Sequence, residues 1–271
     1  KNTALLLGLA LAAMVVCAPS YAQRRLTIIH VNDTHSHLEP LRGGTDSGTG
    51  GVIERAAYRD SVVKADGKRN VLLLHAGDFN QGTSYYTTLG GQLEVDLVNA
   101  MGYDCITLGN HEFDNGIEDL TERVRQIRCP VVCATLDLSS FELGRYVKPY
   151  AVIERGGMRI GIVGLLTDIT TCVSRTISSR IPQFDRVEVL NKYAELLRTE
   201  EKCDYVIALT HIGFEEDQEL AAATRGVDLI VGGHSHTFIK GVKKVRNLDG
   251  KKVPIVTDGC WGLEMGVLKV Y

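Results

Sequence analysis

The sequence has few aromatic residues and little excess charge. Aromatic side chains make up 6% of its 271 residues, with a single Trp, and the formal net charge is -3. Because Lys and Arg are scattered along the chain instead of clustered, the composition argues against a nucleic-acid-binding surface. A hydrophobic fraction of 44% and a charged fraction of 23% are ordinary for a globular protein, and the length allows a sizeable core.

The cysteines lack the spacing of a cysteine-based zinc site. Beyond residue 22 there are six cysteines, and none of them forms a Cys-x-x-Cys pair. An even number permits disulfides in an exported protein. Four of them, however, lie in or near expected core strands, where a free thiol is common: Cys105, Cys129, Cys133 and Cys203. The sequence leaves their pairing open.

The first residues look like a targeting segment. Lys1 precedes an apolar stretch over residues 4–18, and the small residues Ser20 and Ala22 follow it. This pattern is typical of a secretory signal cleaved after Ala22, and the stretch is shorter than the roughly 20 residues that span a membrane. A lipoprotein alternative through Cys17 fits less well, because Val16 stands where a small residue is needed. We expect residues 1–22 to be a signal peptide that directs a protein without a membrane span to the periplasm or the medium.

Short β-branched runs alternate with helical segments along the rest of the chain. This alternation predicts an α/β fold with two sheets flanked by helices. The expected strands are residues 26–31, 71–76, 105–108, 131–134, 205–210, 229–231 and 266–271, and the expected helices are residues 52–65, 87–101, 117–128, 187–201 and 217–224. Two hairpins are expected, one pairing residues 150–154 with 159–165 and the other pairing 240–246 with 252–257.

Five strand ends are followed at once by Asp, Asn or His. They are Asp33-Thr34-His35, Gly77-Asp78, Gly109-Asn110-His111, Thr210-His211 and Gly232-Gly233-His234-Ser235-His236. Side chains that follow parallel strands converge at one edge of an α/β sheet. In an extended segment, residues two apart also point the same way, as expected for His234 and His236. Together these oxygen and nitrogen donors suit two divalent metal ions, with zinc and manganese both reasonable.

Two of these segments resemble signature motifs of the 5'-nucleotidase family of dinuclear metallophosphoesterases. They are LTIIHVNDTHSHL at residues 26–38 and YDCITLGNHEFD at residues 103–114. The second matches throughout, and the first departs only at Val31, whose side chain should not touch metal. The resemblance runs from residue 26 to residue 271. It implies the four-layer αββα sandwich, two mixed sheets flanked by helices, as one metallophosphoesterase domain over residues 23–271.

The resemblance also assigns roles to these residues. It places Asp33, His35, Asp78 and His236 around one ion, and Asp78, Asn110, His211 and His234 around the other, with Asp78 as the bridge. His111 would contact the phosphoryl oxygens and assist the leaving group, and Asp114 would orient it. In an extended segment, His111 would face away from Asn110. By spacing alone, Asp114 could equally be an acid at the start of the following helix.

The remaining histidines, His30, His37 and His75, are expected to be structural, and Glu112 is expected to be loop scaffolding. By resemblance the protein would be an exported phosphohydrolase that releases phosphate from phosphomonoesters, above all nucleoside 5'-monophosphates, by in-line attack of a metal-bound hydroxide. Alternatives are hydrolysis of UDP-sugars, 2',3'-cyclic nucleotides or sulfur esters by the same site. A further alternative is a non-catalytic metal-binding subunit that works only with a partner.

Family members usually have a second, C-terminal domain that binds the nucleobase, and the sequence ends at Tyr271, where the last strand of the metal domain is expected. Three explanations are open. The sequence is truncated, the nucleotide-binding half is a separate polypeptide, or the protein is a broader phosphatase.

Overall fold

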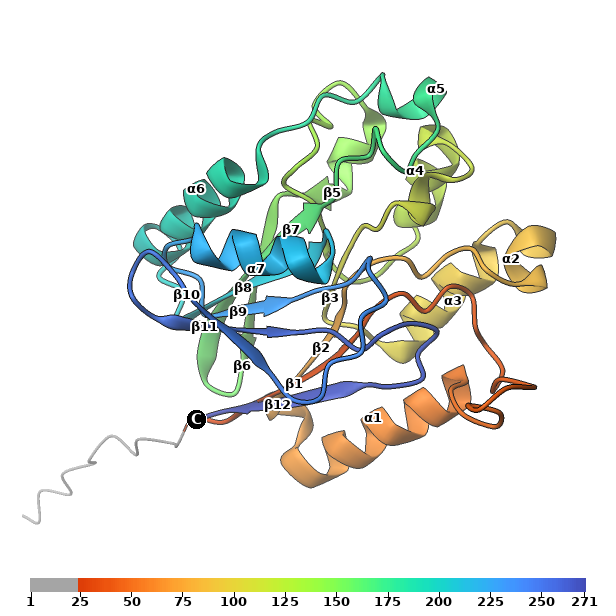
Figure 1. The fold of residues 1–271 in the computed structure, drawn as a ribbon, viewed down its shortest axis with the longest axis horizontal. Helices are drawn as coiled ribbons and strands as arrows, with labels where there is room; N and C mark the ends of the chain where they lie inside the picture. The colour runs from red at the N-terminus through yellow and green to blue at the C-terminus, as the bar shows by residue number, and fades with distance from the viewer. Residues whose placement is uncertain (1–23) are drawn as a thin grey trace, which may run out of the picture.

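Two six-stranded sheets pack face to face between two layers of helices in the computed structural model, which describes residues 24–271 (Figure 1). The expected signal peptide at residues 1–22, with Cys17, lies outside the described residues. Among the described residues, no helix is both long and apolar enough to cross a membrane. The predicted αββα sandwich of two mixed sheets is therefore confirmed.

The first sheet has the order β12-β1-β2-β3-β4-β5. Its strands are β12 (Gly266–Val270), β1 (Leu26–Val31), β2 (Val71–His75), β3 (Cys105–Thr107), β4 (Val131–Val132) and β5 (Val147–Lys148). Strands β1 to β5 run parallel, and β12 closes one edge antiparallel to β1. The parallel strands therefore end together at one edge of the sheet.

The second sheet has the order β10-β11-β9-β8-β7-β6. Its strands are β10 (Lys243–Arg246), β11 (Lys252–Val256), β9 (Leu229–Val231), β8 (Tyr205–His211), β7 (Met158–Leu166) and β6 (Tyr150–Arg155). The four central strands are parallel, and the edge strands β6 and β10 are antiparallel to their neighbours. Both predicted hairpins are present.

Seven α-helices and three short 3-10 helices connect the strands of the described region. They are α1 (Val52–Asp66), α2 (Ser84–Leu89), α3 (Gln92–Met101), α4 (Ile117–Val124), α5 (Arg175–Ser178), α6 (Arg186–Thr199) and α7 (Phe214–Ala222), with η1 (Lys68–Asn70), η2 (His111–Phe113) and η3 (Glu142–Arg145). Helices α1, α3 and α4 cover the outer face of the first sheet, and α6 and α7 cover that of the second.

Alternation along the buried strands builds three apolar layers. In β1, Ile28 faces the second sheet, while Ile29 faces the helices outside the first sheet. In β8, Ile207 lies between the sheets, whereas Ala208 contacts the α6 and α7 layer. Strands that are buried on both faces are apolar at nearly every position. This explains why continuous apolar runs in the sequence predicted the positions of these strands correctly.

The prediction of one helix over residues 87–101 is wrong in one respect, because the structure has two helices in this region. Helix α2 ends at Leu89 and α3 begins at Gln92. Gly90 and Gly91 between them adopt left-handed φ angles of 60° and 89°, which a continuing right-handed helix does not allow. Strand β5 and helix α5 were not predicted from the sequence, because they are too short for a periodic signal. All six cysteines within residues 24–271 are free thiols.

Gly164 on β7 lies where the backbones of the two sheets touch. Its carbonyl accepts a hydrogen bond from the N–H of Ala134 at 2.7 Å, and its N–H donates to the carbonyl of Pro149. A Cβ atom at this position would overlap the backbone carbonyl of Val132. Only glycine therefore lets β7 pack against the end of β4.

We expect Gly164→Ala to lower the free energy of unfolding by about 2–4 kcal/mol, because the new methyl group must push two buried strands apart. Gly43→Ala is the matched control, since a Cβ there would meet no atom within 4 Å. Urea unfolding of both variants measures the difference. Equal stability of the two variants would show that the sheets can separate without cost.

Asp217 on α7 is a buried acid beneath the second sheet. One carboxyl oxygen accepts a hydrogen bond from the hydroxyl of Thr210 at 2.7 Å, and the other has no hydrogen-bond partner. Burial raises the pKa of Asp217 to about 8. The neutral acid therefore predominates in the folded protein at neutral pH, whereas an unfolded chain would ionise it.

The pKa of Asp217 is higher in the folded protein than in the unfolded chain. The contribution of Asp217 to the free energy of unfolding is therefore favourable at low pH and is lost as the pH rises towards 8. Asp217→Asn remains neutral throughout. We expect the variant to gain stability over the natural protein by up to about 1.4 kcal/mol per pH unit between pH 4 and pH 8. Urea unfolding of both metal-free proteins across this range tests the prediction. Parallel stability curves would contradict it.

Candidate metal centre

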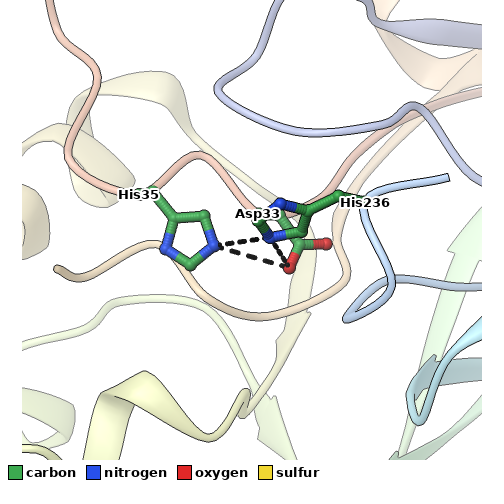
Figure 2. A group of neighbouring side chains, drawn as sticks. All are labelled: Asp33, His35 and His236. Atoms are coloured by element: carbon green, nitrogen blue, oxygen red, sulfur yellow. Dashed lines mark hydrogen bonds and ion pairs between the residues drawn. The ribbon is translucent and has the colours of Figure 1, made fainter. Parts of the chain in front are cut away.

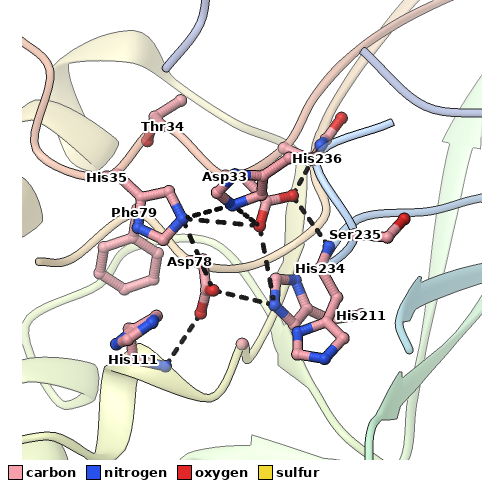
Figure 3. Close-up of polar contacts among 12 residues, drawn as sticks. Asp33, Thr34, His35, Asp78, Phe79, His111, His211, His234, Ser235 and His236 are labelled. Carbon is pink, nitrogen blue, oxygen red and sulfur yellow. Dashed lines mark hydrogen bonds and ion pairs between the residues drawn. The ribbon is translucent and has the colours of Figure 1, made fainter. Parts of the chain in front are cut away.

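The predicted ligands come together where strands of both sheets end. Asp33 follows β1, Asp78 follows β2 and Asn110 follows β3, while His211 is the last residue of β8 and His234 follows β9. Figure 3 shows side chains from the first sheet facing those from the second across this edge. The two sheets therefore supply the two halves of one site.

Asp33, His35 and His236 form the first group (Figure 2). The Nε2 atoms of His35 and His236 lie 2.9 Å apart. Asp33 Oδ1 lies 3.3 Å from His236 Nε2 and 3.7 Å from His35 Nε2. Two imidazole nitrogens that face each other beside a carboxylate oxygen suit a shared cation.

Asp78, His211 and His234 form the second group. Asp78 Oδ2 lies 3.1 Å from His211 Nε2, and it is also 3.8 Å from His35 Nε2 of the first group. Asp78 therefore stands between the two groups, as a bridging carboxylate would. Asn110 is buried beside it, and the next residue, His111, donates its backbone N–H to Asp78 Oδ1 at 2.9 Å.

The loops that hold these side chains are not extended, which corrects the geometry expected from the sequence. Asp33, His35, Asp78, His234 and His236 all have left-handed φ angles, between 46° and 82°. Asn110 is right-handed helical, and His111 begins η2. Asp33 and His35 do converge, but tight turns bring them together, not an extended strand. Such conformations are costly outside glycine and persist where surrounding contacts enforce them.

Three buried atoms of the site have no hydrogen-bond partner, namely Asp33 Oδ1, Asn110 Oδ1 and His211 Nε2. Unpaired polar atoms are rare inside proteins. The opposite ring nitrogens are fixed, because His211 Nδ1 lies 2.7 Å from the carbonyl of Ala76 and His35 Nδ1 lies 3.3 Å from that of Asn80. Backbone contacts of this kind aim the Nε2 atom of a histidine at a metal. The residues therefore fit two divalent cations.

The electrostatics of the site favour cations. Burial alone would lower the pKa of His211, but the carboxylates of Asp78 and Asp33 raise it to about 10. The adjacent carboxylate of Asp33 likewise raises the pKa of His236 to about 10. Two buried carboxylates thus create a negative potential strong enough to retain protons on neighbouring imidazoles. Divalent cations would replace these protons, since metal ligands bind in their deprotonated form.

His111 and Asp114 lie at the more open rim of the site. His111 Nδ1 is 2.9 Å from Asp114 Oδ2, and each side chain is 32% exposed, whereas Asp33 and Asp78 are nearly inaccessible. The hydrogen bond to Asp114 raises the pKa of His111. The His111 ring also lies edge-on to the ring of His35, with centroids 5.4 Å apart. An imidazole near the metal ligands but open to solvent can reach a bound substrate.

Two polar residues that support the site were not predicted as functional. Asn32 donates to Asp33 Oδ2 at 2.6 Å and to the carbonyl of Gly259 at 2.7 Å, which turns Asp33 Oδ1 towards the histidines. Glu112, expected only as loop scaffolding, is buried and accepts backbone hydrogen bonds from the loops around Asp78 and Gly109. Each of them lies inside a signature motif, since Asn32 directly precedes the predicted ligand Asp33 and Glu112 directly follows the predicted acid His111. This position is the signal in the sequence that could have identified them.

The other histidines have structural partners. His30 Nδ1 lies 2.5 Å from Asp258 Oδ2, and His75 Nε2 lies 3.1 Å from the hydroxyl of Thr34. His37 stacks on Trp261, with ring centroids 4.9 Å apart. None of these three histidines belongs to either candidate metal group of the described residues.

Known proteins resemble this chain in sequence and in architecture. The family model described as calcineurin-like phosphoesterase matches residues 26–238. A 5'-nucleotidase of Rattus norvegicus is 36% identical over an alignment that covers 97% of this chain and 49% of that protein. The solved structure of a 5'-nucleotidase precursor from Thermus thermophilus is also 36% identical, with a TM-score of 0.84, and the match covers 91% of this chain and 51% of that one.

A further solved structure, the NAD nucleotidase of Haemophilus influenzae, is 29% identical, with a TM-score of 0.81, and the match covers 90% of this chain and 47% of that one. The chain thus spans about half the length of the relatives it matches. The matching family model covers most of the chain, including both motifs and every predicted ligand. The chain therefore belongs to the calcineurin-like phosphoesterase family and has 5'-nucleotidases among its relatives.

Proposed function

We propose that this protein is a metal-dependent phosphohydrolase that releases phosphate from nucleoside 5'-monophosphates. The observation that carries the proposal is the position of Asp78 between two groups of ligands, with the His111–Asp114 pair beside them. Paired cations in one site are suited to in-line displacement at a phosphoryl group. The names of the 5'-nucleotidase relatives support the choice of substrate.

In this proposal, Asp33, His35 and His236 hold one cation, Asn110, His211 and His234 hold the other, and Asp78 reaches both. When bound, the cations supply Lewis acidity, which neutralises phosphate charge and lowers the pKa of a water molecule. Oxygen and nitrogen ligands of this mixture suit zinc and manganese. We propose one of these metals in each position.

His111 is the proposed general acid. Its Nδ1 atom is held by Asp114 at 2.9 Å, which leaves the Nε2–H free to meet a substrate. Because the pKa of His111 is raised by that hydrogen bond, the imidazolium is favoured more than in a free histidine. It can then donate a hydrogen bond to a phosphoryl oxygen and a proton to the departing alkoxide oxygen. A buried, purely structural metal site would need no such group.

Export and leaving-group choice are further parts of the proposal. The pattern of residues 1–22 supports export to the periplasm or the medium. A separate base-binding polypeptide finds no support, because the half of each relative that this chain does not match belongs to the same polypeptide. The proposed activity is therefore assigned to the metal domain.

His111→Ala and Asp78→Ala should separate proton transfer from metal binding. We expect His111→Ala to keep two metal ions per chain and to lower kcat by about 10²–10⁴-fold, because a general acid contributes about this much. Asp78→Ala should lose both bound metal and activity, since it removes the shared ligand. Metal content and kcat measured on the same samples give the comparison.

Asp114→Asn is the matched variant, because it keeps the size of the side chain but removes the charge that favours the imidazolium. It should retain metal and lose less activity than His111→Ala. If His111→Ala instead released metal, the separation of ligand from general acid would be wrong.

Phosphate release by the purified chain, depleted of metal and reloaded with zinc or manganese, tests the substrate class. We expect AMP to be hydrolysed with a kcat/KM at least about tenfold above that of UDP-glucose, 2',3'-cyclic AMP and p-nitrophenyl phosphate. Such a ratio corresponds to about 1.4 kcal/mol of additional transition-state binding. The metal-free chain serves as the control.

Equal, weak and metal-dependent release from all four compounds would contradict the nucleotide part of the proposal and leave a broad phosphatase. Preference for UDP-glucose or the cyclic nucleotide would reassign the substrate. No release with either metal would refute the catalytic proposal and favour a subunit that requires a partner.

A further inference from the structure

Glu112 is a buried carboxylate in which both oxygens are fully used. Its Oε2 atom accepts the backbone N–H of Asp78 at 2.9 Å and that of Gly109 at 2.6 Å. Its Oε1 atom accepts the N–H of Phe79 at 3.0 Å and that of Asn80 at 3.1 Å. The residue is 2% exposed. It therefore contacts four backbone donors and stays beneath the surface of the site.

These four donors belong to two different loops of the metal centre. Asp78, Phe79 and Asn80 follow β2, whereas Gly109 follows β3 and directly precedes Asn110. A Cβ atom on Gly109 would overlap both the carboxylate and the backbone nitrogen of Asp78. The backbones of the two loops are therefore in direct contact, and the hydrogen bonds to Glu112 stabilise this contact.

A further hydrogen bond joins the two loops, and in this one the Asn110 loop supplies the donor and the Asp78 loop supplies the acceptor. The N–H of His111 donates to Asp78 Oδ1 at 2.9 Å, while Asp78 Oδ2 faces His211 (Figure 3). The orientation of the Asp78 carboxylate therefore depends on where the Asn110 loop lies. The carbonyl of Asn80, at the other end of the first loop, is 3.3 Å from His35 Nδ1. Displacing this loop would disturb ligands of both candidate groups.

We propose that Glu112 is the positioning residue that fixes Asp78 against Asn110 and so preforms both metal sites before any metal enters. It touches neither metal nor substrate and acts through the backbone of its neighbours. The inference rests on the metal-binding part of the proposed function and does not depend on the identity of the phosphoester.

The variant Glu112→Gln is unusually informative because of this arrangement. A carboxylate is an acceptor at both oxygens, whereas an amide replaces one of them with two donors. Each oxygen of Glu112 already accepts two N–H groups. Either orientation of the substituted amide would therefore point its amino group at two backbone donors, and no flip of the amide relieves the conflict.

Glu94 provides a matched control within the same chain. It is also buried, at 3% exposed, and one of its oxygens accepts the hydroxyl of Ser36. Its other oxygen has no hydrogen-bond partner. In Glu94→Gln, the amino group of the new amide can take that second position without meeting a donor. Both substitutions exchange a buried carboxyl group for an amide of the same size, and only Glu112→Gln opposes the loops around Asp78.

We expect Glu112→Gln to weaken binding of manganese or zinc by about 10–100-fold, as is typical when a residue supporting metal ligands is lost. Glu94→Gln should change the affinity by less than about threefold. Calorimetric titration of each metal-free protein measures the affinity, and circular dichroism checks the fold. Equal metal affinity of Glu112→Gln and the natural protein would overturn the proposal.

Hydrogen exchange on the metal-free natural protein tests preformation without any variant, and so keeps the proposal falsifiable even if Glu112→Gln does not fold. We expect the amides of Asp78, Phe79, Asn80 and Gly109 to exchange at least about 100-fold more slowly than those of Gly43 and Gly44 in an exposed loop. Fast exchange that slows only when metal is added would show that the metal organises the loops, and would refute the proposal. Neither the metal titration nor hydrogen exchange uses a nucleotide. A failure of the Glu112 proposal can therefore be distinguished from a failure of the proposed hydrolysis.

Discussion

The structure depends on keeping two carboxylates, Asp33 and Asp78, close together and out of water. Burying two like charges costs several kcal/mol unless positive charge or hydrogen bonds compensate. His211 lies within 4 Å of both carboxylates and His236 lies 3.3 Å from Asp33, and these contacts raise the pKa of each histidine. The same negative potential would attract divalent cations. The ligand loops adopt left-handed conformations, and these conformations direct short side chains into one small volume.

Neither sheet could form this site alone. Asp33 and Asp78 follow strands of the first sheet, whereas His211 ends one strand of the second sheet and His234 and His236 follow another. The apolar layer between the sheets therefore determines the spacing of the ligands as well as the stability of the fold. At Gly164 that layer narrows until the two backbones touch, so the position of β7 beside β4 leaves no freedom for a side chain. Close packing of this kind transmits a small shift in one sheet to ligands that belong to the other.

Sequence patterns predicted the central strands well, and they located the candidate ligands that the structure brings together, because both are encoded locally. Strands buried on both faces have continuous apolar runs, and the ligands follow those runs directly. What the sequence did not reveal depends on contacts between distant segments. The break at Gly90 and Gly91, and the contact of Glu112 with Phe79, 33 residues earlier in the chain, appear only once β2 and β3 lie side by side. Left-handed angles at non-glycine ligands could not be read from the sequence either, since the surrounding contacts impose them.

Reaction chemistry and substrate choice are physically separate in this architecture. In the proposed reaction, the candidate ligands would contact only the phosphate and the attacking water, and the His111–Asp114 pair at the rim would reach the oxygen that departs. Everything beyond that oxygen lies outside the metal centre. Two relatives with the same fold are named a 5'-nucleotidase and an NAD nucleotidase, and in each case the matching region is about half of the protein. Proteins with this fold are thus named for different phosphoesters, and in the proposed function the leaving group would be recognised by contacts that the candidate ligands do not make. Selectivity can therefore change through residues around the rim or in the unmatched half of such proteins, while the buried carboxylates and their supporting hydrogen bonds stay as they are.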